Sequence, residues 1–302
     1  MSTRDTRPME HRGRRHRTTT SIPLTFDVPG RSLHCPMVTA TIAGCTTQLI
    51  VDTGATAHLL TTDLAQRAGL HLTAATPGRD VAGDLVPSWR VGDVPVDLES
   101  SSIMLQEVVA IDGPEPFRDW GVGGFLSPQA LAVDATVLLD LATDRIDIVG
   151  DESATAVADL VRRFDNSVLL EGTRHAAGTL GIHVRVPPAR PVVAIFDTGA
   201  AETEFAADAL ETTVDGVVRL SGKGVGGSEI RVTILKDQDL DIGTVQLRVP
   251  NLGVRDEIPA PHDAAESEIP RALIGMDVLR GTAIAITTPD QGSVWWCVPN
   301  QG

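Results

Sequence analysis

The sequence predicts an all-β protein of two similar lobes with a few short helices. Three observations predict it: a motif that occurs twice, a second landmark that follows each copy, and alternating apolar residues around both. The motif is LIVDTGAT at residues 49–56 and AIFDTGAA at residues 194–201, and the second aspartate follows the first by 145 positions. The landmarks are FLSPQAL at 125–131 and LIGMDVL at 273–279, and their second apolar residues follow the aspartates by 74 and 77 residues. Two matched landmarks in the same order indicate an internal duplication.

The segments that precede each DTG triplet have the pattern of β-hairpins. Apolar residues alternate with threonines at 38–42, and a turn at Ala43-Gly44 leads into an apolar run that ends at Asp52. In the second half, alternating residues at 182–186 precede Pro187-Pro188 and a run that ends at Asp197. Helical patterns are confined to short segments, which we predict near 61–69, 127–133, 152–164 and 276–280.

Domain boundaries follow from the charge pattern and from the duplication. Residues 151–153 offer helix-start chemistry, and no strand pattern crosses them. The strand-like segments 21–28 and 292–298 are expected to pair with each other beneath this junction. The chain is therefore divided into a disordered basic tail at 1–20, an N-terminal lobe at 21–150, a linker helix at 151–166 and a C-terminal lobe at 167–302.

Composition excludes several classes of protein. The 302 residues are 42% hydrophobic, which is ample for a packed core, and no apolar stretch reaches the roughly 18 residues of a membrane span. The net charge is −15, with six arginines in the first twenty residues, and this acidic body argues against binding to nucleic acid. Cys35, Cys45 and Cys297 are too few and odd in number for a disulfide scaffold, so we expect reduced thiols in a cytoplasmic protein.

The duplicated motifs resemble those of the aspartic peptidases, specifically the bacterial retropepsin-like proteins in which two retroviral-type lobes are fused in one chain. The resemblance covers nearly all of residues 21–300, and it rests on DTGA twice and on an apolar pair before a short helix twice. It implies the bilobal acid-protease (pepsin/retropepsin-like) barrel fold, in which two DTG loops meet at a pseudo-two-fold axis and hold a water. It also implies an aspartic endopeptidase that acts on a peptide or protein without any metal or organic cofactor.

Asp52 and Asp197 are the predicted catalytic residues. Two carboxylates in contact cannot both ionise, so one keeps a proton and acts as an acid while the other acts as a base; aspartic proteases are the established example. Pepsin-like lobes usually carry a hydroxyl residue directly after DTG, and this hydroxyl hydrogen-bonds the carboxylate, whereas this chain has alanine there. Without that donor, and within an acidic protein, the pair should hold its proton to higher pH than in a pepsin-like enzyme. The residues predicted to support the pair are Thr53, Gly54, Ala55, Thr198, Gly199 and Ala200.

The resemblance also implies a flap, a β-hairpin that closes over the substrate, and each half offers a Gly-rich segment suited to this role. These segments are VAGDLVPSW at 81–89 and SGKGVGGSE at 221–229. The chain has no tyrosine, so the flap tyrosine of pepsin-like enzymes is absent and the retroviral type is favoured. The candidate flap residues are Trp89, Gly224, Gly226 and Gly227.

Two departures from strict repetition keep an alternative open. Ser127 stands where the second half has Gly275, and Thr56 stands where the second half has Ala201. A lobe that has diverged can keep its fold without activity, so the alternative is a catalytically inactive peptide-binding or scaffold module. The presence of both aspartates favours the enzyme, and because both lie in one chain, a monomer is sufficient for catalysis.

The remaining motifs have simpler interpretations. GKGVGG at 222–227 matches a dinucleotide-binding pattern, but the next residues have a strand pattern instead of the required helix. Trp295 and Trp296 are expected to pack in the core. The basic tail, with a net charge of +4, is a candidate to lie across an acidic cleft and restrain it. No metal site is predicted, because metal-ligand spacing is absent among His58, His71, His175 and His183.

Overall fold

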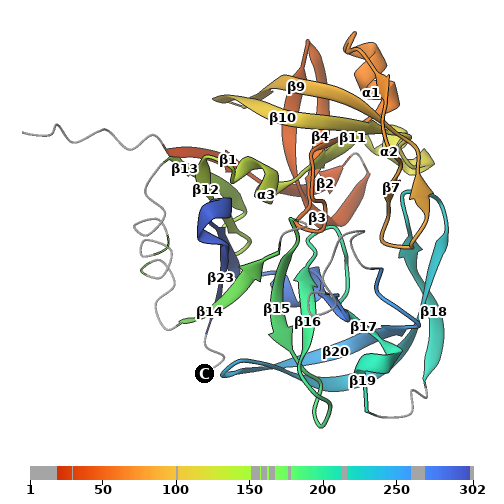
Figure 1. The fold of residues 1–302 in the computed structure, drawn as a ribbon, viewed down its shortest axis with the longest axis vertical. Coiled ribbons are helices and arrows are strands. Elements are labelled where there is room, and N and C mark those ends of the chain that lie inside the picture. The colour runs from red at the N-terminus through yellow and green to blue at the C-terminus, as the bar shows by residue number, and fades with distance from the viewer. Residues whose placement is uncertain are drawn as a thin grey trace, which may run out of the picture.

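The computed structural model describes residues 19–28, 30–99, 101–150, 157, 162, 167–175, 178–211, 216–259 and 269–299. The chain forms two lobes of strands, one above the other in Figure 1, with short helices at their edges. The predicted tail at 1–20 lies outside the described residues except for Thr19 and Thr20. Of the predicted linker helix at 151–166, only Val157 and Arg162 are described.

The N-terminal lobe is a sheet in the order β2-β3-β4-β11-β5-β10-β9-β6, accompanied by a small β7–β8 hairpin. Its distinctive feature is that β4 pairs in parallel with β11, and β5 pairs in parallel with β10. Its strands are β2 (Thr25–Val28), β3 (Arg31–Ile42), β4 (Cys45–Val51), β5 (Leu59–Thr61), β6 (Thr73–Ala74), β7 (Gly78–Arg79), β8 (Leu85–Val86), β9 (Ser88–Leu98), β10 (Ser101–Ile111) and β11 (Val122–Leu126).

The C-terminal lobe repeats this arrangement in the order β15-β16-β21-β17-β20-β19-β18. Here β16 pairs in parallel with β21, and β17 pairs in parallel with β20. The strand-by-strand correspondence confirms the duplication that the two DTG motifs predict. The strands of this lobe are β15 (Leu180–Val184), β16 (Val192–Phe196), β17 (Glu204–Ala206), β18 (Val217–Lys223), β19 (Glu229–Ile242), β20 (Val245–Arg255) and β21 (Ala272–Ile274).

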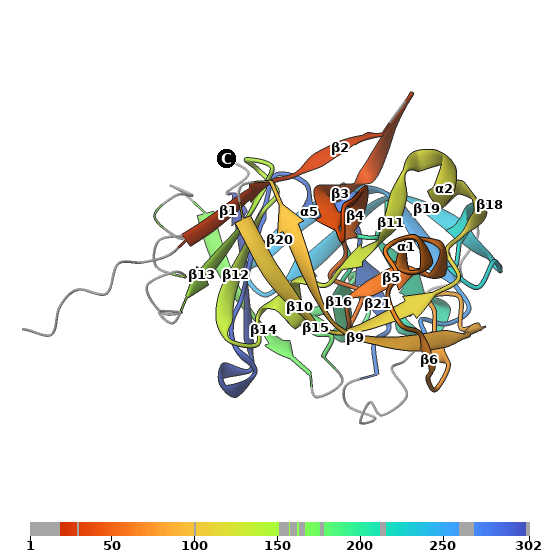
Figure 2. The same cartoon turned by 90° about the horizontal axis from the view of Figure 1, so that it is seen from above.

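A run of six strands joins the lobes, in the order β1-β13-β12-β22-β23-β14. Each half contributes three of them, and the halves meet where β12 pairs antiparallel with β22, for example Val137 with Ile286. Figure 2 shows β12 and β13 beside β1. The strands are β1 (Thr19–Pro23), β12 (Ala135–Asp140), β13 (Arg145–Gly150), β14 (Ser167–Arg174), β22 (Ala283–Ile286) and β23 (Ser293–Pro299).

The expected pairing of segments 21–28 and 292–298 is therefore wrong. Both contribute to this run, but β1 pairs with β13, whereas β23 pairs with β22 and β14. The physical reason is local: β12 and β13 form a tight hairpin within the first half, and β22 and β23 do the same within the second half. Each end of the chain thus pairs within its own half.

The helices are as short as the sequence predicts, with one addition. α1 (Thr62–Arg67), α3 (Pro128–Leu131) and α5 (Met276–Leu279) lie inside predicted segments, and two single turns follow at η1 (Ala207–Ala209) and η3 (Pro289–Gln291). α2 (Glu115–Trp120) was not predicted. It begins after Pro114 and ends at Trp120, where it is capped by Gly121, whose φ of 69° suits glycine, and only its Phe117 is buried. One buried residue leaves no periodic pattern to detect.

The main core runs through both lobes and includes Trp296, which is fully buried as expected. Its indole nitrogen donates to Thr282 Oγ1 at 2.8 Å, and its ring meets Phe196 edge-on at 5.5 Å between centroids. Phe196 directly precedes Asp197, so this packing supports the strand that carries the second DTG loop. Within the described ranges, no helix is long and apolar enough to cross a membrane.

Candidate active site

Each DTG loop begins where one strand of a parallel pair ends. Asp52 follows β4, and its backbone N–H donates to Leu126 O at 3.0 Å. Asp197 follows β16, and its N–H donates to Ile274 O at the same distance. The acceptors are the second apolar residues of the two landmarks. The landmarks therefore position the aspartates, which explains why both features occur twice.

The two loops are tied together by their threonines, as the sequence predicts. Thr53 Oγ1 accepts from the N–H of Thr198, and Thr198 Oγ1 accepts from the N–H of Thr53, both at 3.0 Å. The same hydroxyls donate across the interface to Phe196 O at 2.8 Å and to Val51 O at 2.6 Å. Both threonines are buried, so these four bonds fix the position of one lobe's loop against the other.

The carboxylates are held by the backbone that follows them. Oδ1 of Asp52 accepts from the N–H groups of Gly54 and Ala55 at 2.7 and 3.3 Å. Oδ1 of Asp197 accepts from Gly199 and Ala200 at 2.9 and 3.1 Å. These bonds fix one oxygen of each carboxylate against its own loop.

The glycines bring the two carboxylates together. A Cβ atom on Gly54 would lie 2.8 Å from Oδ1 of Asp197, and one on Gly199 would lie 3.0 Å from Cγ of Asp52. Each glycine therefore lies against the opposite aspartate, where any side chain would displace the carboxylate. The structure brings all eight predicted dyad and supporting residues into one site.

Burial raises the pKa of both aspartates. The pKa of Asp197 rises to about 8, chiefly through burial and then through the negative charge of Asp52, while the N–H groups of Gly199 and Ala200 oppose the rise. Burial likewise raises the pKa of Asp52, against the N–H groups of Gly54 and Ala55. The pair therefore keeps a proton to higher pH than a free carboxyl would.

Cys35 on β3 also lies at this site, although the residues around it in the sequence do not indicate a role there. Its Sγ donates to Gly199 O at 3.1 Å. Burial, followed by the charges of Asp52 and Asp197, raises the pKa of this thiol to about 12. Cys35 is thus a neutral thiol that holds the backbone of the second loop. It was missed because the contact depends on how two lobes pack, and no local motif surrounds it.

Ser127 explains one departure from strict repetition. Its hydroxyl donates to Ala55 O at 2.7 Å, and its N–H donates to Nδ1 of the buried His58 at 3.2 Å. Burial lowers the pKa of His58 to about 4, which keeps the imidazole neutral and Nδ1 able to accept. The sequence predicts no metal-binding role for His58, and its support of the first DTG loop was not foreseen.

In the second lobe the corresponding position must be glycine. A Cβ on Gly275 would lie 2.4 Å from backbone atoms of Glu202. The N–H of Gly275 donates to Thr203 Oγ1 at 3.1 Å, so Thr203 is the acceptor here that His58 is in the first lobe. The hydroxyl of Thr203 in turn donates to Asp277 Oδ1 at 2.8 Å. The two lobes therefore support their DTG loops through different side chains at matching places.

The Gly-rich segments form two hairpins whose tips meet. The N–H groups of Gly226 and Ser228 donate to Oδ2 of Asp80 and Oδ2 of Asp84 at 2.8 and 3.2 Å. Figure 1 shows the β7 region and β18 side by side at the edge of the molecule. A Cβ on Gly226 would lie 2.7 Å from Cβ of Asp84, so glycine is required for this approach. We call residues 78–86 the N-flap and residues 217–234 the C-flap.

Gly224 also belongs to the contact between the flaps, because its Cβ would lie 2.1 Å from Oδ2 of Asp80. Gly227 has a φ of +99° and forms the turn itself. Trp89 is the exception among the predicted flap residues. It lies in β9, opposite Ala110 of β10 and Ala74 of β6, because the N-flap hairpin already closes at Val86.

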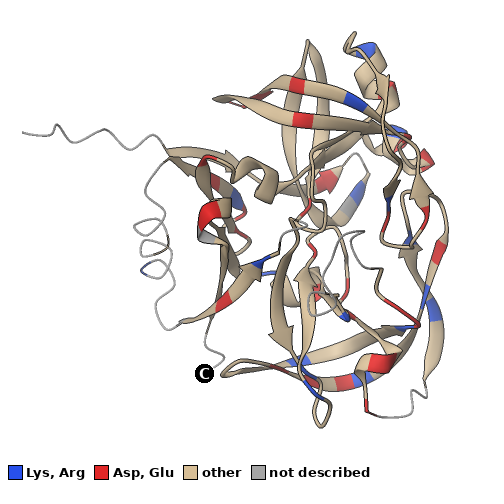
Figure 3. Cartoon of the chain, in the orientation of Figure 1, with Lys and Arg blue, Asp and Glu red and all other residues tan. Residues whose placement is uncertain are grey.

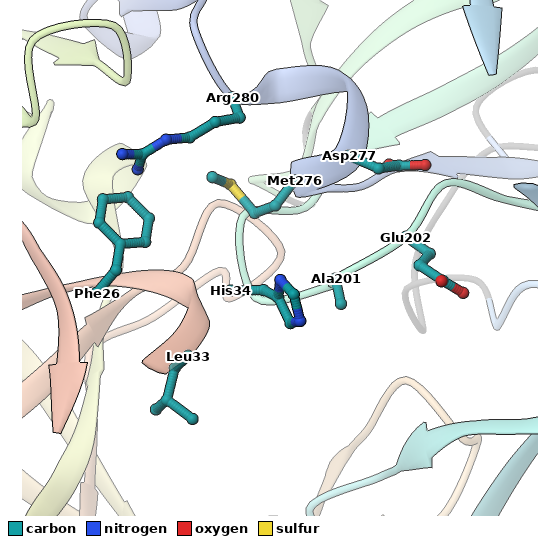
Figure 4. Close-up of a pocket in the computed structure, with 8 residues that line it drawn as sticks. All are labelled: Phe26, Leu33, His34, Ala201, Glu202, Met276, Asp277 and Arg280. Atoms are coloured by element: carbon teal, nitrogen blue, oxygen red, sulfur yellow. The ribbon is translucent and has the colours of Figure 1, made fainter. Parts of the chain in front are cut away.

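A cavity of about 390 Å³ opens beside the second DTG loop (Figure 4). The loop contributes Ala201 and Glu202, and His34 lies beside Ala201 in Figure 4. The guanidinium carbon Cζ of Arg280 lies over the ring of Phe26, 3.7 Å from the ring centroid. The cavity is completed by Leu33, Met276 and Asp277. Acidic residues occur in both lobes (Figure 3), and β19 carries four of them, Glu229, Asp237, Asp239 and Asp241.

Comparison with known proteins bears on this site. Residues 38–120, which include the first DTG loop and the N-flap, match the family model described as aspartyl protease. No curated protein matches the sequence. This match and the duplicated fold confirm the resemblance to the aspartic peptidases.

Among solved structures, similar folds include conglutin gamma, a basic 7S globulin from lupine seeds, with a TM-score of 0.50, 11% identity, and coverage of 94% of this chain and 95% of that chain. The basic 7S globulin from soybean has a TM-score of 0.50 and 10% identity over 92% and 94%. The aspartic proteinase from Irpex lacteus has a TM-score of 0.49 and 12% identity over 94% and 98%. At these identities the likeness to the globulins shows the fold alone.

Proposed function

We propose that this protein is an aspartic endopeptidase that hydrolyses peptide bonds with Asp52 and Asp197 as its catalytic pair. The observation that carries the proposal is that each aspartate lies against the glycine of the opposite loop, in a site closed by four threonine bonds. A structural role would need one DTG turn in each lobe, but not a half-buried and a buried carboxylate in contact with each other.

The two aspartates titrate as a pair that shares one proton, and we write the reaction with Asp52 ionised and Asp197 protonated. The charge of Asp52 contributes to the raised pKa of Asp197, which is consistent with Asp52 ionising first while Asp197 keeps its proton. Asp52 takes a proton from a water as the water oxygen attacks the peptide carbonyl carbon, and Asp197 donates its proton to the carbonyl oxygen. Asp52 then protonates the leaving nitrogen, the C–N bond breaks, and a hydroxyl proton of the intermediate returns to Asp197.

The flaps give the site its substrate class. The tips of the two flaps meet, because backbone N–H groups of the C-flap donate to carboxylates of the N-flap. A substrate held beneath two joined hairpins would be a narrow, extended chain. A peptide segment meets this requirement, and its backbone can bond to flap strands. Because one chain holds both aspartates, a monomer is sufficient.

The proposal is tested by incubating the protein with a mixture of synthetic peptides in H₂¹⁸O between about pH 3 and pH 8 and analysing the products by mass spectrometry. We expect internal cleavage, with one ¹⁸O in each new carboxyl group after a single turnover, because water attacks directly. The alternative function, a catalytically inactive peptide-binding or scaffold module, predicts that peptides are bound but remain intact at every pH. That result with folded protein would overturn the proposal.

A further inference from the structure

The duplication places chemically opposite residues at matching positions on the two sides of the dyad. Leu59 on β5 pairs with Phe125 of β11, and Glu204 on β17 pairs with Leu273 of β21 in the same register. The neighbouring strands end at Ile111, opposite Thr61, and at Arg255, opposite Ala206. The pair Leu59 and Ile111 of the first lobe thus corresponds to Glu204 and Arg255 of the second.

In the N-terminal lobe, these positions belong to an apolar cluster beside the first DTG loop. Leu59 and Ala55 pack against it, and so does Val225 from the tip of the C-flap. The opposite flap therefore reaches into this cluster with a side chain. The buried members of the cluster are Val28, Met37, Ile50, Val86, Ile111, Phe117, Val122 and Phe125.

In the C-terminal lobe, the same positions form a buried ion pair. Arg255 Nε lies 3.4 Å from Glu204 Oε2, and both residues are less than a tenth exposed. Arg255 Nη1 donates to Val81 O at the N-flap tip at 3.0 Å, and Ser221 of the C-flap donates to Glu204 Oε1 at 2.5 Å. The polar pair thus lies between the lobe and both flaps, as the apolar cluster does on the other side.

The ion pair is close enough to the dyad to influence it. The charge of Glu204 contributes to the raised pKa of Asp197, although less than burial and Asp52 do. Burial lowers the pKa of Arg255, opposed by the charges of Glu204 and then Asp197. The two residues therefore lie on the Asp197 side of the dyad, beneath the contacts that both flaps make with them.

Arg255 also has a donor left over. Among the described residues, its buried Nη2 has no hydrogen-bond partner, and its buried Nε has only the ion-pair contact with Glu204. Buried donors are almost always satisfied, so Nη2 is suited to an acceptor that arrives with a ligand. The Glu204–Arg255 pair is neutral as a whole, and the dyad adds a negative charge, which disfavours a carboxylate. A neutral amide suits both partners, because its oxygen accepts from Arg255 and its NH₂ donates to Glu204.

We propose that Arg255 and Glu204 determine specificity: the Asp197 side of the cleft selects a Gln or Asn side chain, while the Asp52 side selects an apolar one. This inference rests on the proposed function for its position in a cleavage reaction. The substrate would then carry an apolar residue on one side of the scissile bond and an amide residue on the other. Loss of the hydrogen bonds should reduce selection by about tenfold or more.

The test uses a peptide library that presents Gln and Met, and Asn and Leu, as matched pairs of similar shape. Wild-type cleavage should show amide enrichment at one position and apolar enrichment at a position across the scissile bond. The informative variant is Glu204→Leu with Arg255→Ile, which reproduces the residues of the first lobe and removes both charges together, a change that buried ion pairs often tolerate. We expect it to prefer apolar residues on both sides.

The matched control is Asp239→Leu with Arg248→Ile, which removes an exposed ion pair of β19 and β20 and should leave the profile unchanged. A wild-type library profile without amide enrichment, or an active double variant with the wild-type profile, would overturn the inference. Binding of the same peptides to the Asp52→Asn protein tests the specificity inference separately from the proposed peptidase activity. Selective binding of amide peptides without any wild-type cleavage would reject the enzyme and retain the specificity.

Discussion

Asp197 holds a proton in the folded protein at a pH where a free carboxyl has lost it, and this has a consequence for stability. Its folded pKa of about 8 lies above the value of 3.8 for an unperturbed carboxyl. Between these two values the unfolded chain loses the proton while the folded chain keeps it. The free energy of unfolding therefore falls as pH rises through this window, and the contribution is fully present only below the lower value.

We predict that Asp197→Asn stabilises the protein near neutral pH, because asparagine has no proton to lose. The increase in the free energy of unfolding should be on the order of a few kcal/mol near pH 8 and should shrink toward zero near pH 4. Denaturant unfolding of both proteins at several pH values measures it. Asp134→Asn, at an exposed carboxylate, is the control and should show no such trend. The prediction would be contradicted if wild type and Asp197→Asn had the same free energy of unfolding near pH 8 as well as near pH 4.

At the level of residues, the sequence identifies the dyad loops but not the groups that support them from outside. DTGA occurs twice, so Asp52, Asp197 and their neighbours could be assigned from the repeat alone. Cys35 and His58 reach the same site through the packing of β3 against the second loop and of Ser127 against the first. Such contacts join residues far apart in the chain, and nothing in either local sequence signals them.

At the level of elements, the contact between the flaps depends on carboxylates that sequence reasoning overlooked. Asp80 uses Oδ1 within its own turn, accepting from Ala82 and Asp84 at 3.0 and 2.8 Å, and Oδ2 for Gly226 of the C-flap. The two oxygens thus have separate tasks. A substitution that keeps one acceptor and removes the other isolates the bond between the flaps.

Asp80→Asn is that substitution, since the amide oxygen can stay in the turn while the NH₂ group cannot accept from Gly226. We predict that hydrogen exchange at the Gly226 amide becomes about five- to tenfold faster, as expected for the loss of one hydrogen bond. Exchange within the N-flap turn should change little. Asp134→Asn again serves as the charge control. If Gly226 exchanges at the wild-type rate in Asp80→Asn, the two flaps are not held together by this carboxylate.

The flaps also show how far element prediction extends. Glycine content located both hairpins, because tight turns and close approach require it. It did not locate their ends, so Trp89 was assigned to a flap although it belongs to β9. α2 was missed for a related reason, since a helix of six residues with a single buried side chain has no detectable period.

At the level of the whole molecule, the duplication determines most of the architecture. The matched order of strands in the two lobes could be expected once two landmarks repeated in sequence. The junction between the lobes could not, because it depends on which strands of each half remain unpaired after local hairpins form. Val137 and its neighbours on β12 meet β22 because β13 and β23 are already paired on their other sides.

The central claim is that two aspartates from two lobes act as one catalytic unit, and the most direct measurement compares peptide cleavage by the wild type, Asp52→Asn, Asp197→Asn and the double variant. The account predicts that each single variant loses at least about a hundredfold in kcat/KM and that the double variant loses no more than either, because the pair works only together. Cleavage that persists in either single variant, with the protein folded, would contradict the account.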